Sequence, residues 1–153
     1  MKKRIKWLPF LLLSLLLFSC SSQKEISPAE IADSVEASVK EVHFIPSDAR
    51  YLRANIDLEE SLVIRYDAKR CEDASASEFG VFECRDTASA EKLATRIEKR
   101  LKDRLEMADN RYFSDEIQNL NNAEVTRRQN YVFYCVLPTP KNQTATQIFI
   151  NAF

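Results

Sequence analysis

The chain has 153 residues, with 22 basic and 23 acidic side chains and a formal net charge of −1. A length of this order predicts a single domain. The one glycine in the chain excludes the glycine-rich loops that hold phosphate groups in nucleotide-binding enzymes.

Residues 1–19 have the layout of a secretory signal peptide. Residues 2–7, KKRIKW, carry four positive charges, and the 11 residues 8–18, LPFLLLSLLLF, are apolar apart from Ser14. A helix that spans a bilayer needs about 20 apolar residues, whereas a short apolar segment after a basic one is typical of a leader that is removed on export. A buried N-terminal helix is the alternative, but this segment has neither a polar face nor a helix-stop signal.

The leader ends in Leu17-Phe18-Ser19-Cys20, which resembles the lipobox of bacterial lipoproteins. In that family an apolar residue precedes an obligatory cysteine by three positions and a small residue stands directly before it. Leu17 and Ser19 fit the pattern, while Phe18 is bulkier than usual. The resemblance implies that residues 1–19 are cleaved and that Cys20 receives acyl chains, such as palmitate, which hold it at the extracytoplasmic face of the cell membrane. Ordinary secretion, with Cys20 free or in a disulfide, is the alternative.

Cleavage before Cys20 would change the charge of the protein. It removes four basic residues and no acidic one, which leaves 18 basic and 23 acidic residues and a net charge of −5. A negative chain disfavours nucleic acid as a partner and adhesion to anionic lipid by charge alone. Attachment to the membrane would therefore depend on acyl chains, and two such chains suffice for stable binding. We expect residues 20–27 to be the lipidated N-terminus with a short tether and residues 28–153 to be one domain.

The first half of this domain contains two predicted helices and two predicted strands. Ser27-Pro28 begins a helix over roughly residues 28–42, with an apolar face at spacings of three and four, and Pro46 ends it. A short, weakly patterned helix follows from Ser47 toward Ala54. The strands are residues 61–67, SLVIRYD, and residues 78–85, EFGVFECR, which we expect to pair antiparallel across a loop at residues 68–77.

Gly80 lies inside the second of these strands. A glycine at such a position indicates a bulge or a close approach by another element.

The second half begins with an amphipathic helix of about 20 residues, capped by Asp86. Its apolar stripe consists of Ala90, Leu93, Ala94, Ile97, Leu101, Leu105 and Ala108. A short helix after Ser114 and a hairpin of residues 124–127 and 131–137 follow, with Gln129-Asn130 near the turn. Thr139-Pro140 then begins the last helix.

These elements predict an α+β fold in the order α-ββ-α-ββ-α. Two hairpins would form a four-stranded antiparallel sheet with the long helices on one face. The order of elements, together with the segments VIRYD, FGVFECRD, AEKL and NYVFYCV, is similar to a family of small bacterial surface lipoproteins catalogued as a domain of unknown function. The resemblance implies the fold and the location, and it offers no catalytic residue.

Few residues in the sequence indicate chemistry. His43 is the single histidine, and its position at the predicted end of a helix favours an interaction with the helix dipole or a surface role. No cysteine lies at a spacing that would pair with it as a nucleophile. The cysteines and acidic residues also lack the spacings of zinc and calcium sites, so we expect no metal and no cofactor.

Three cysteines remain if Cys20 is lipidated. Cys71 falls in the predicted loop, so we expect it to be an exposed thiol. Cys84 and Cys135 could form a disulfide if their strands are neighbours, or they could be small buried apolar groups.

Together these features predict a lipid-anchored protein of the bacterial cell envelope. We expect a non-catalytic binding or interaction module close to the membrane, with an envelope protein as its partner, no nucleic acid as a partner and no enzymatic activity. The alternative is a lipoprotein that binds a small ligand in a concave pocket lined by the aromatic residues Tyr131, Phe133 and Tyr134. If the protein has no such pocket, we expect these three side chains to belong to the core.

Overall fold

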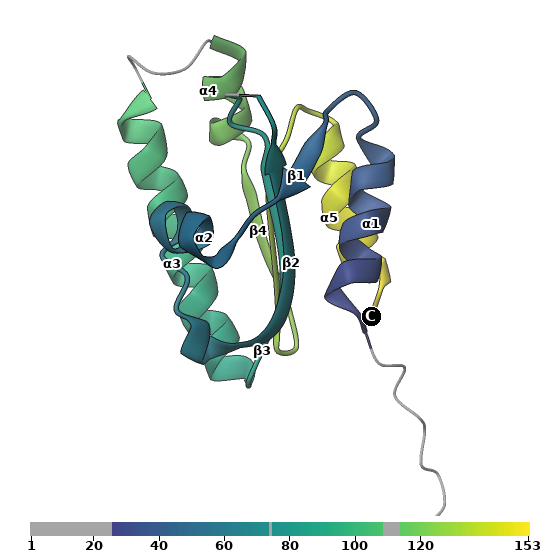
Figure 1. The fold of residues 1–153 in the computed structure, drawn as a ribbon, viewed down its shortest axis with the longest axis vertical. Coiled ribbons are helices and arrows are strands. Elements are labelled where there is room, and N and C mark those ends of the chain that lie inside the picture. Colours follow the sequence, from purple (N-terminus) through teal and green to yellow (C-terminus); the bar gives the residue numbers. More distant parts are fainter. Residues whose placement is uncertain (1–25, 74, 109–113) are drawn as a thin grey trace, which may run out of the picture.

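A five-stranded antiparallel sheet lies between two layers of helices (Figure 1). This computed structural model describes residues 26–73, 75–108 and 114–153, and all statements on the fold refer to them. The strand order is β1-β2-β3-β5-β4, and each neighbouring pair is antiparallel. The strands are β1 (Phe44–Pro46), β2 (Val63–Cys71), β3 (Glu78–Cys84), β4 (Glu124–Arg128) and β5 (Tyr131–Val136).

The helices divide between the two faces of the sheet. One face carries α1 (Pro28–Ser38) and α5 (Lys141–Asn151), and the other carries α2 (Ala49–Ile56), α3 (Thr87–Glu106) and α4 (Ser114–Asn121) (Figure 1). A short 3-10 turn, η2 (Glu60–Leu62), leads into β2.

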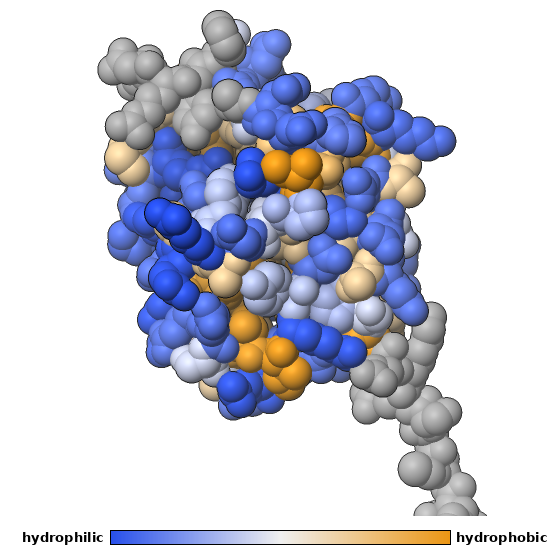
Figure 2. All heavy atoms as spheres, viewed as in Figure 1, coloured by the Kyte–Doolittle hydropathy of each residue, from blue (hydrophilic) through white to orange (hydrophobic). Residues whose placement is uncertain are grey.

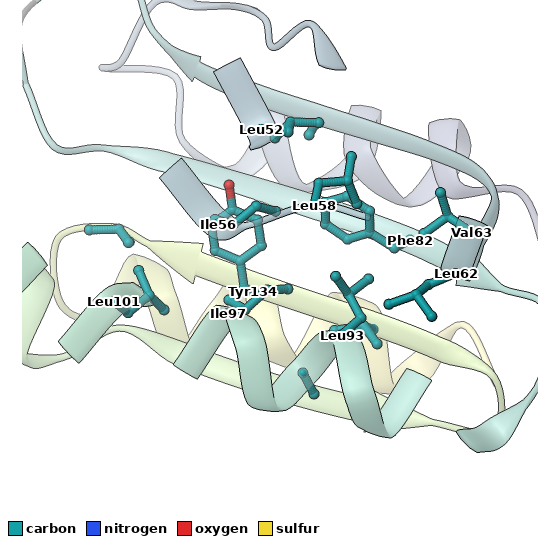
Figure 3. Close-up of a cluster of buried hydrophobic side chains, with 14 of the residues drawn as sticks. Leu52, Ile56, Leu58, Leu62, Val63, Phe82, Leu93, Ile97, Leu101 and Tyr134 are labelled. Atoms are coloured by element: carbon teal, nitrogen blue, oxygen red, sulfur yellow. The ribbon is translucent and has the colours of Figure 1, made fainter. Parts of the chain in front are cut away.

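Each face of the sheet buries its own hydrophobic cluster. Under α2 and α3, the rings of Phe82 and Tyr134 pack with Ile56, Leu93 and Ile97 (Figure 3). Under α1 and α5 the cluster contains Val35, Phe79, Phe133 and Phe149, and the rings of Phe133 and Phe149 are stacked with centroids 5.3 Å apart. The sheet is therefore the middle layer of the molecule and contributes to both cores.

The prediction that the long helices share one face of the sheet was wrong. Every residue of β5 is buried, because Phe133 points into the cluster under α5 while Tyr134 points into the cluster under α3. A strand with two apolar faces needs cover on both. The segment YVFYCV thus required two helical layers.

The prediction of four strands was also wrong, and the order of elements changes with it. Residues Phe44–Pro46 form an edge strand in which Phe44 pairs with Cys71 and Pro46 with Lys69. A strand of three residues is too short to show an alternating pattern, and proline is tolerated at a sheet edge. The order is therefore α1-β1-α2-β2-β3-α3-α4-β4-β5-α5, with α1 ending at Ser38 instead of near residue 42.

Several elements confirm the prediction. The helix α3 covers Thr87–Glu106 with Asp86 as its cap, and the Asp86 carboxylate accepts a hydrogen bond from the Ser89 amide at 2.7 Å. The strands β2 and β3 pair antiparallel, although β2 continues to Cys71, so the connecting loop is shorter than predicted. The β4–β5 turn lies at Gln129-Asn130 as predicted, but the positive φ of 51° belongs to Gln129.

Gly80 confirms the close approach that the sequence indicated. A Cβ atom at this position would lie 2.7 Å from the Phe82 ring and 2.9 Å from the Tyr134 ring. The register places Gly80 opposite Tyr134 on the neighbouring strand. The missing side chain therefore makes room for two aromatic rings of the core under α3.

Candidate functional site

The predicted lipidation site lies outside the described residues. This holds for Leu17, Phe18, Ser19 and Cys20 alike, so the cleavage of the leader and the acylation of Cys20 stay predictions.

The first described residue, Ile26, is fixed to the sheet by two hydrogen bonds. Its carbonyl oxygen accepts from the Tyr131 hydroxyl at 3.0 Å and from the Arg65 guanidinium at 3.2 Å. Arg65 also pairs with the carboxylate of Glu83. The domain is therefore held to its own N-terminal segment only six positions after Cys20.

The prediction that Cys71 is an exposed thiol was wrong. Cys71 is the last residue of β2 and not part of a loop, and only 7% of it is exposed. Its backbone pairs with Phe44 of β1, the strand that the sequence did not reveal. The added edge strand thus explains why this cysteine is covered.

Cys84 and Cys135 are buried and not bonded to each other. Their strands are neighbours, but the register places Cys135 opposite Phe79, and the two thiols contribute to the clusters on opposite faces of the sheet. Burial raises the pKa of Cys84 to about 11 and that of Cys135 to about 12. Both are therefore buried apolar groups that stay protonated at neutral pH.

His43 lies between α1 and β1 on the surface and is not at a helix end. Its Nε2 atom is 3.4 Å from a carboxylate oxygen of Glu72, and its carbonyl oxygen accepts from the Glu72 amide at 3.0 Å. The imidazole therefore contacts an exposed acid, as expected for a surface residue.

The most unusual polar group of the described residues is the buried carboxylate of Glu78, at the start of β3. Glu78 is 1% exposed. One of its oxygens accepts from the Arg104 guanidinium, and the other accepts from the Tyr51 hydroxyl at 2.7 Å. The Arg70 guanidinium lies over the Tyr51 ring, 5.0 Å from its centroid. We call Tyr51, Glu78, Arg104 and the nearby Tyr134 the Glu78 cluster.

The electrostatics of the Glu78 cluster keep both of its tyrosines protonated. Burial and the Glu78 charge raise the pKa of Tyr51 and of Tyr134 well above the usual range. Within the described part of the chain, the Tyr134 hydroxyl is buried without a hydrogen-bond partner. The cluster joins α2 and α3 to β3, because Tyr51, Arg104 and Glu78 come from these three elements.

The sequence contained a signal for the Glu78 cluster that our interpretation missed. Glu78 precedes Gly80, Phe82 and Cys84 at alternate positions, so it shares their buried face. Arg104 follows Leu101 by three positions on the apolar stripe of α3. A charge on each of two apolar faces indicates a buried ion pair.

Two shallow grooves lie on opposite layers. The groove between α3, α4 and β4 has a volume of about 310 Å³, and its lining consists of Glu98, Leu101, Lys102, Leu105, Leu120, Ala123 and Val125. The groove between α1 and α5 has a volume of about 400 Å³, and its lining consists of Glu30, Ile31, Ser34, Ile148, Asn151 and Ala152. Neither lining contains an aromatic residue. Tyr131, Phe133 and Tyr134 are all buried in the core.

Two further properties concern metals and membranes. In residues 26–73, 75–108 and 114–153, no three His, Cys, Asp or Glu side chains gather in a way that could hold a metal ion. No helix of these same residues is both long and apolar enough to cross a bilayer.

Comparison with known families decides where the chain belongs. Residues 46–137 match the family described as a domain of unknown function, DUF4358, and this segment covers more than half of the 153 residues. The chain belongs to the DUF4358 family. The DUF4358 segment runs from the end of β1 to just past β5 and contains the whole Glu78 cluster, while α1 and α5 lie outside it. Comparisons with curated proteins and with solved structures gave no match.

Proposed function

We propose that this DUF4358 protein is a lipid-anchored lipoprotein of the bacterial cell envelope. In this proposal the leader is removed, Cys20 carries the acyl chains, and the domain acts as a non-catalytic binding or interaction module close to the membrane. The observation that carries the proposal is the sequence Leu17-Phe18-Ser19-Cys20 followed, six positions later, by the anchored residue Ile26.

The short distance between Cys20 and Ile26 supports a position close to the membrane. Six residue steps reach at most about 22 Å when fully extended. The domain would therefore stand next to the lipid surface, where an envelope protein is the partner that it could contact.

The Glu78 cluster supports a non-catalytic role. Its carboxylate is engaged by Arg104 and Tyr51, and its tyrosines hold their protons because burial raises their pKa. Such a group contributes to holding helices on the sheet, and a substrate cannot reach it without displacing them.

The lipid anchor can be tested by replacing its attachment atom. Cys20→Ala should move the protein from the membrane fraction to the soluble fraction and abolish incorporation of labelled palmitate, because the thiol that forms the thioether is gone. Ser22→Ala, two positions later, serves as the matched control and should stay in the membrane fraction. If Cys20→Ala remains in the membrane fraction with normal labelling, the anchor is elsewhere.

Binding of a small ligand is the second candidate, and the groove between α3, α4 and β4 is the observation that favours it. The floor of this groove is apolar, with Leu101, Leu105 and Leu120, and Glu98 and Lys102 are charged groups in its lining. Val125→Glu would place a charge in the groove. If a small apolar ligand raises the melting temperature of the natural protein and not that of Val125→Glu, ligand binding is the better account.

A further inference from the structure

Ile26, the first described residue, is bound at one end of the sheet. Arg65 and Tyr131, which hold the Ile26 carbonyl, both pair with Glu83 in the register of the sheet. This end contains the start of β2, the end of β3 and the β4–β5 turn, and it is the lower end in Figure 1. We call it the tether end.

The opposite end of the domain lies one helix length away. The helix α3 begins directly after β3, at the tether end, and contains 20 residues. At 1.5 Å per residue it is about 30 Å long. Met107, which follows α3, therefore marks the far end.

The tether end exposes apolar side chains. Among the described residues the large hydrophobic side chains with high exposure are Ile64 at 58%, Met107 at 55% and Phe153 at 38%. Ile64 directly precedes Arg65, and the Phe153 ring is 5.1 Å from the Tyr131 ring. Two of these three residues thus adjoin the residues that hold Ile26. Figure 2 shows hydrophobic residues reaching the surface near the lower end of the same view and also near its upper end.

The length of the tether limits which end can rest on the membrane. Six residue steps span at most about 22 Å even when fully extended, whereas the domain is about 30 Å long along α3. A lipid attached at Cys20 therefore keeps the tether end near the headgroups, while the far end projects away from them.

We propose that the tether end is a lipid-facing surface, with Ile64 and Phe153 in contact with the interfacial region of the bilayer. This inference depends on the lipid anchor proposed above. The acyl chains supply the affinity, because charge at this end is mixed: Arg65 is paired with Glu83, and the exposed Asp86 caps α3. The Ile26 contacts and the two apolar side chains set the orientation.

The orientation can be read from single tryptophan residues. Trp7 is the only tryptophan of the chain and lies in the leader, so the cleaved protein would have none. Ile64→Trp, Phe153→Trp and Met107→Trp each add one reporter at an exposed position. The lipidated proteins are reconstituted in phosphatidylcholine vesicles, with and without brominated phosphatidylcholine, and first checked by flotation.

The two ends should differ in quenching. Fluorescence of Ile64→Trp and Phe153→Trp should fall about twofold, because interfacial side chains lie roughly 5–10 Å deep at the boundary of headgroups and acyl chains. Fluorescence of Met107→Trp should not change. Two results would overturn the orientation alone, provided that the variants float with the vesicles. In the first, Met107→Trp is quenched as strongly as Ile64→Trp. In the second, neither Ile64→Trp nor Phe153→Trp is quenched. A protein that does not float overturns the lipid anchor, and the orientation with it.

Discussion

Arg104 of α3 and Glu78 of β3 form a buried ion pair, with Glu78 1% exposed and its second carboxylate oxygen 2.7 Å from the Tyr51 hydroxyl. Removing one partner of a buried pair leaves an uncompensated charge, which costs about 3–5 kcal/mol. We therefore expect Arg104→Met to lower the free energy of unfolding by an amount of this order, measured by urea denaturation. Lys102→Met, on the exposed side of the same helix, should change it by less than about 0.5 kcal/mol.

A double replacement separates the ion pair from simple loss of packing. When both charges are removed, as in Glu78→Met with Arg104→Met, no buried charge is left unpaired. The double variant should therefore be more stable than Arg104→Met alone. If it is less stable by the full sum of the single effects, the two residues are not coupled as described.

Gly80 should not tolerate even a methyl group. The added Cβ of Gly80→Ala would lie 2.7 Å from the Phe82 ring and 2.9 Å from the Tyr134 ring, and overpacking of this kind costs about 1–3 kcal/mol. Thermal unfolding should show a lower melting temperature for Gly80→Ala. Combining it with Phe82→Leu, which shortens one of the two neighbours, should cost less than the sum of the single changes.

Much of the fold could be predicted, because the longer elements show a regular spacing of apolar residues and have recognisable capping residues. The helix α3 has a stripe over five turns and a capping aspartate, and the predicted strand at residues 78–85 agrees with β3 to within one residue. The strand β1 could not be found in the same way, since three residues with a proline have no period. The covering of Cys71 depends on β1 and was missed with it.

The two-sided helical cover was predictable in principle. YVFYCVL is apolar on both faces, a property that calls for a layer on each side of β5. The Glu78 cluster was harder to foresee, because its members are far apart in sequence. Tyr51 precedes Glu78 by 27 positions, and Arg104 follows it by 26. Only the contact between the last turn of α3 and the start of β3 shows that Arg104 and Glu78 meet.

The cap of α3 gives a prediction for pH dependence. Hydrogen bonds from Ser89 hold the pKa of the Asp86 carboxyl below its usual value. A folded-state pKa below the unfolded one adds stability above the unfolded pKa of about 3.9, and this stability is lost as the pH falls through the folded pKa. Asp86→Ala should therefore lower the melting temperature at neutral pH, and its difference from the natural protein should shrink in acid.

Asp86→Asn is the matched control for this cap. Asparagine caps helices about as well as aspartate but does not titrate. It should retain most of the melting temperature at neutral pH and show a weaker dependence on acid. A deficit of Asp86→Ala that stays constant from neutral pH into acid would contradict the role of the charged cap.

The cysteines of the domain should react only after unfolding. Cys71, Cys84 and Cys135 are all buried, and burial raises the pKa of Cys84 to about 11 and of Cys135 to about 12, so the reactive thiolate is scarce. In the Cys20→Ala background, iodoacetamide at mildly alkaline pH should label the native protein far more slowly than the urea-unfolded one. Rapid labelling of Cys71 in the native protein would show that β1 leaves the sheet edge.

The intact mass of the protein isolated from membranes decides whether Cys20 carries the lipid anchor. We expect a chain that begins at Cys20, without residues 1–19 and therefore without Trp7, and a mass that exceeds this polypeptide by a diacylglyceryl group. Digestion should place the added mass on the peptide that contains Cys20. A protein that retains its leader, or that is cut elsewhere and carries an unmodified Cys20, would contradict the account.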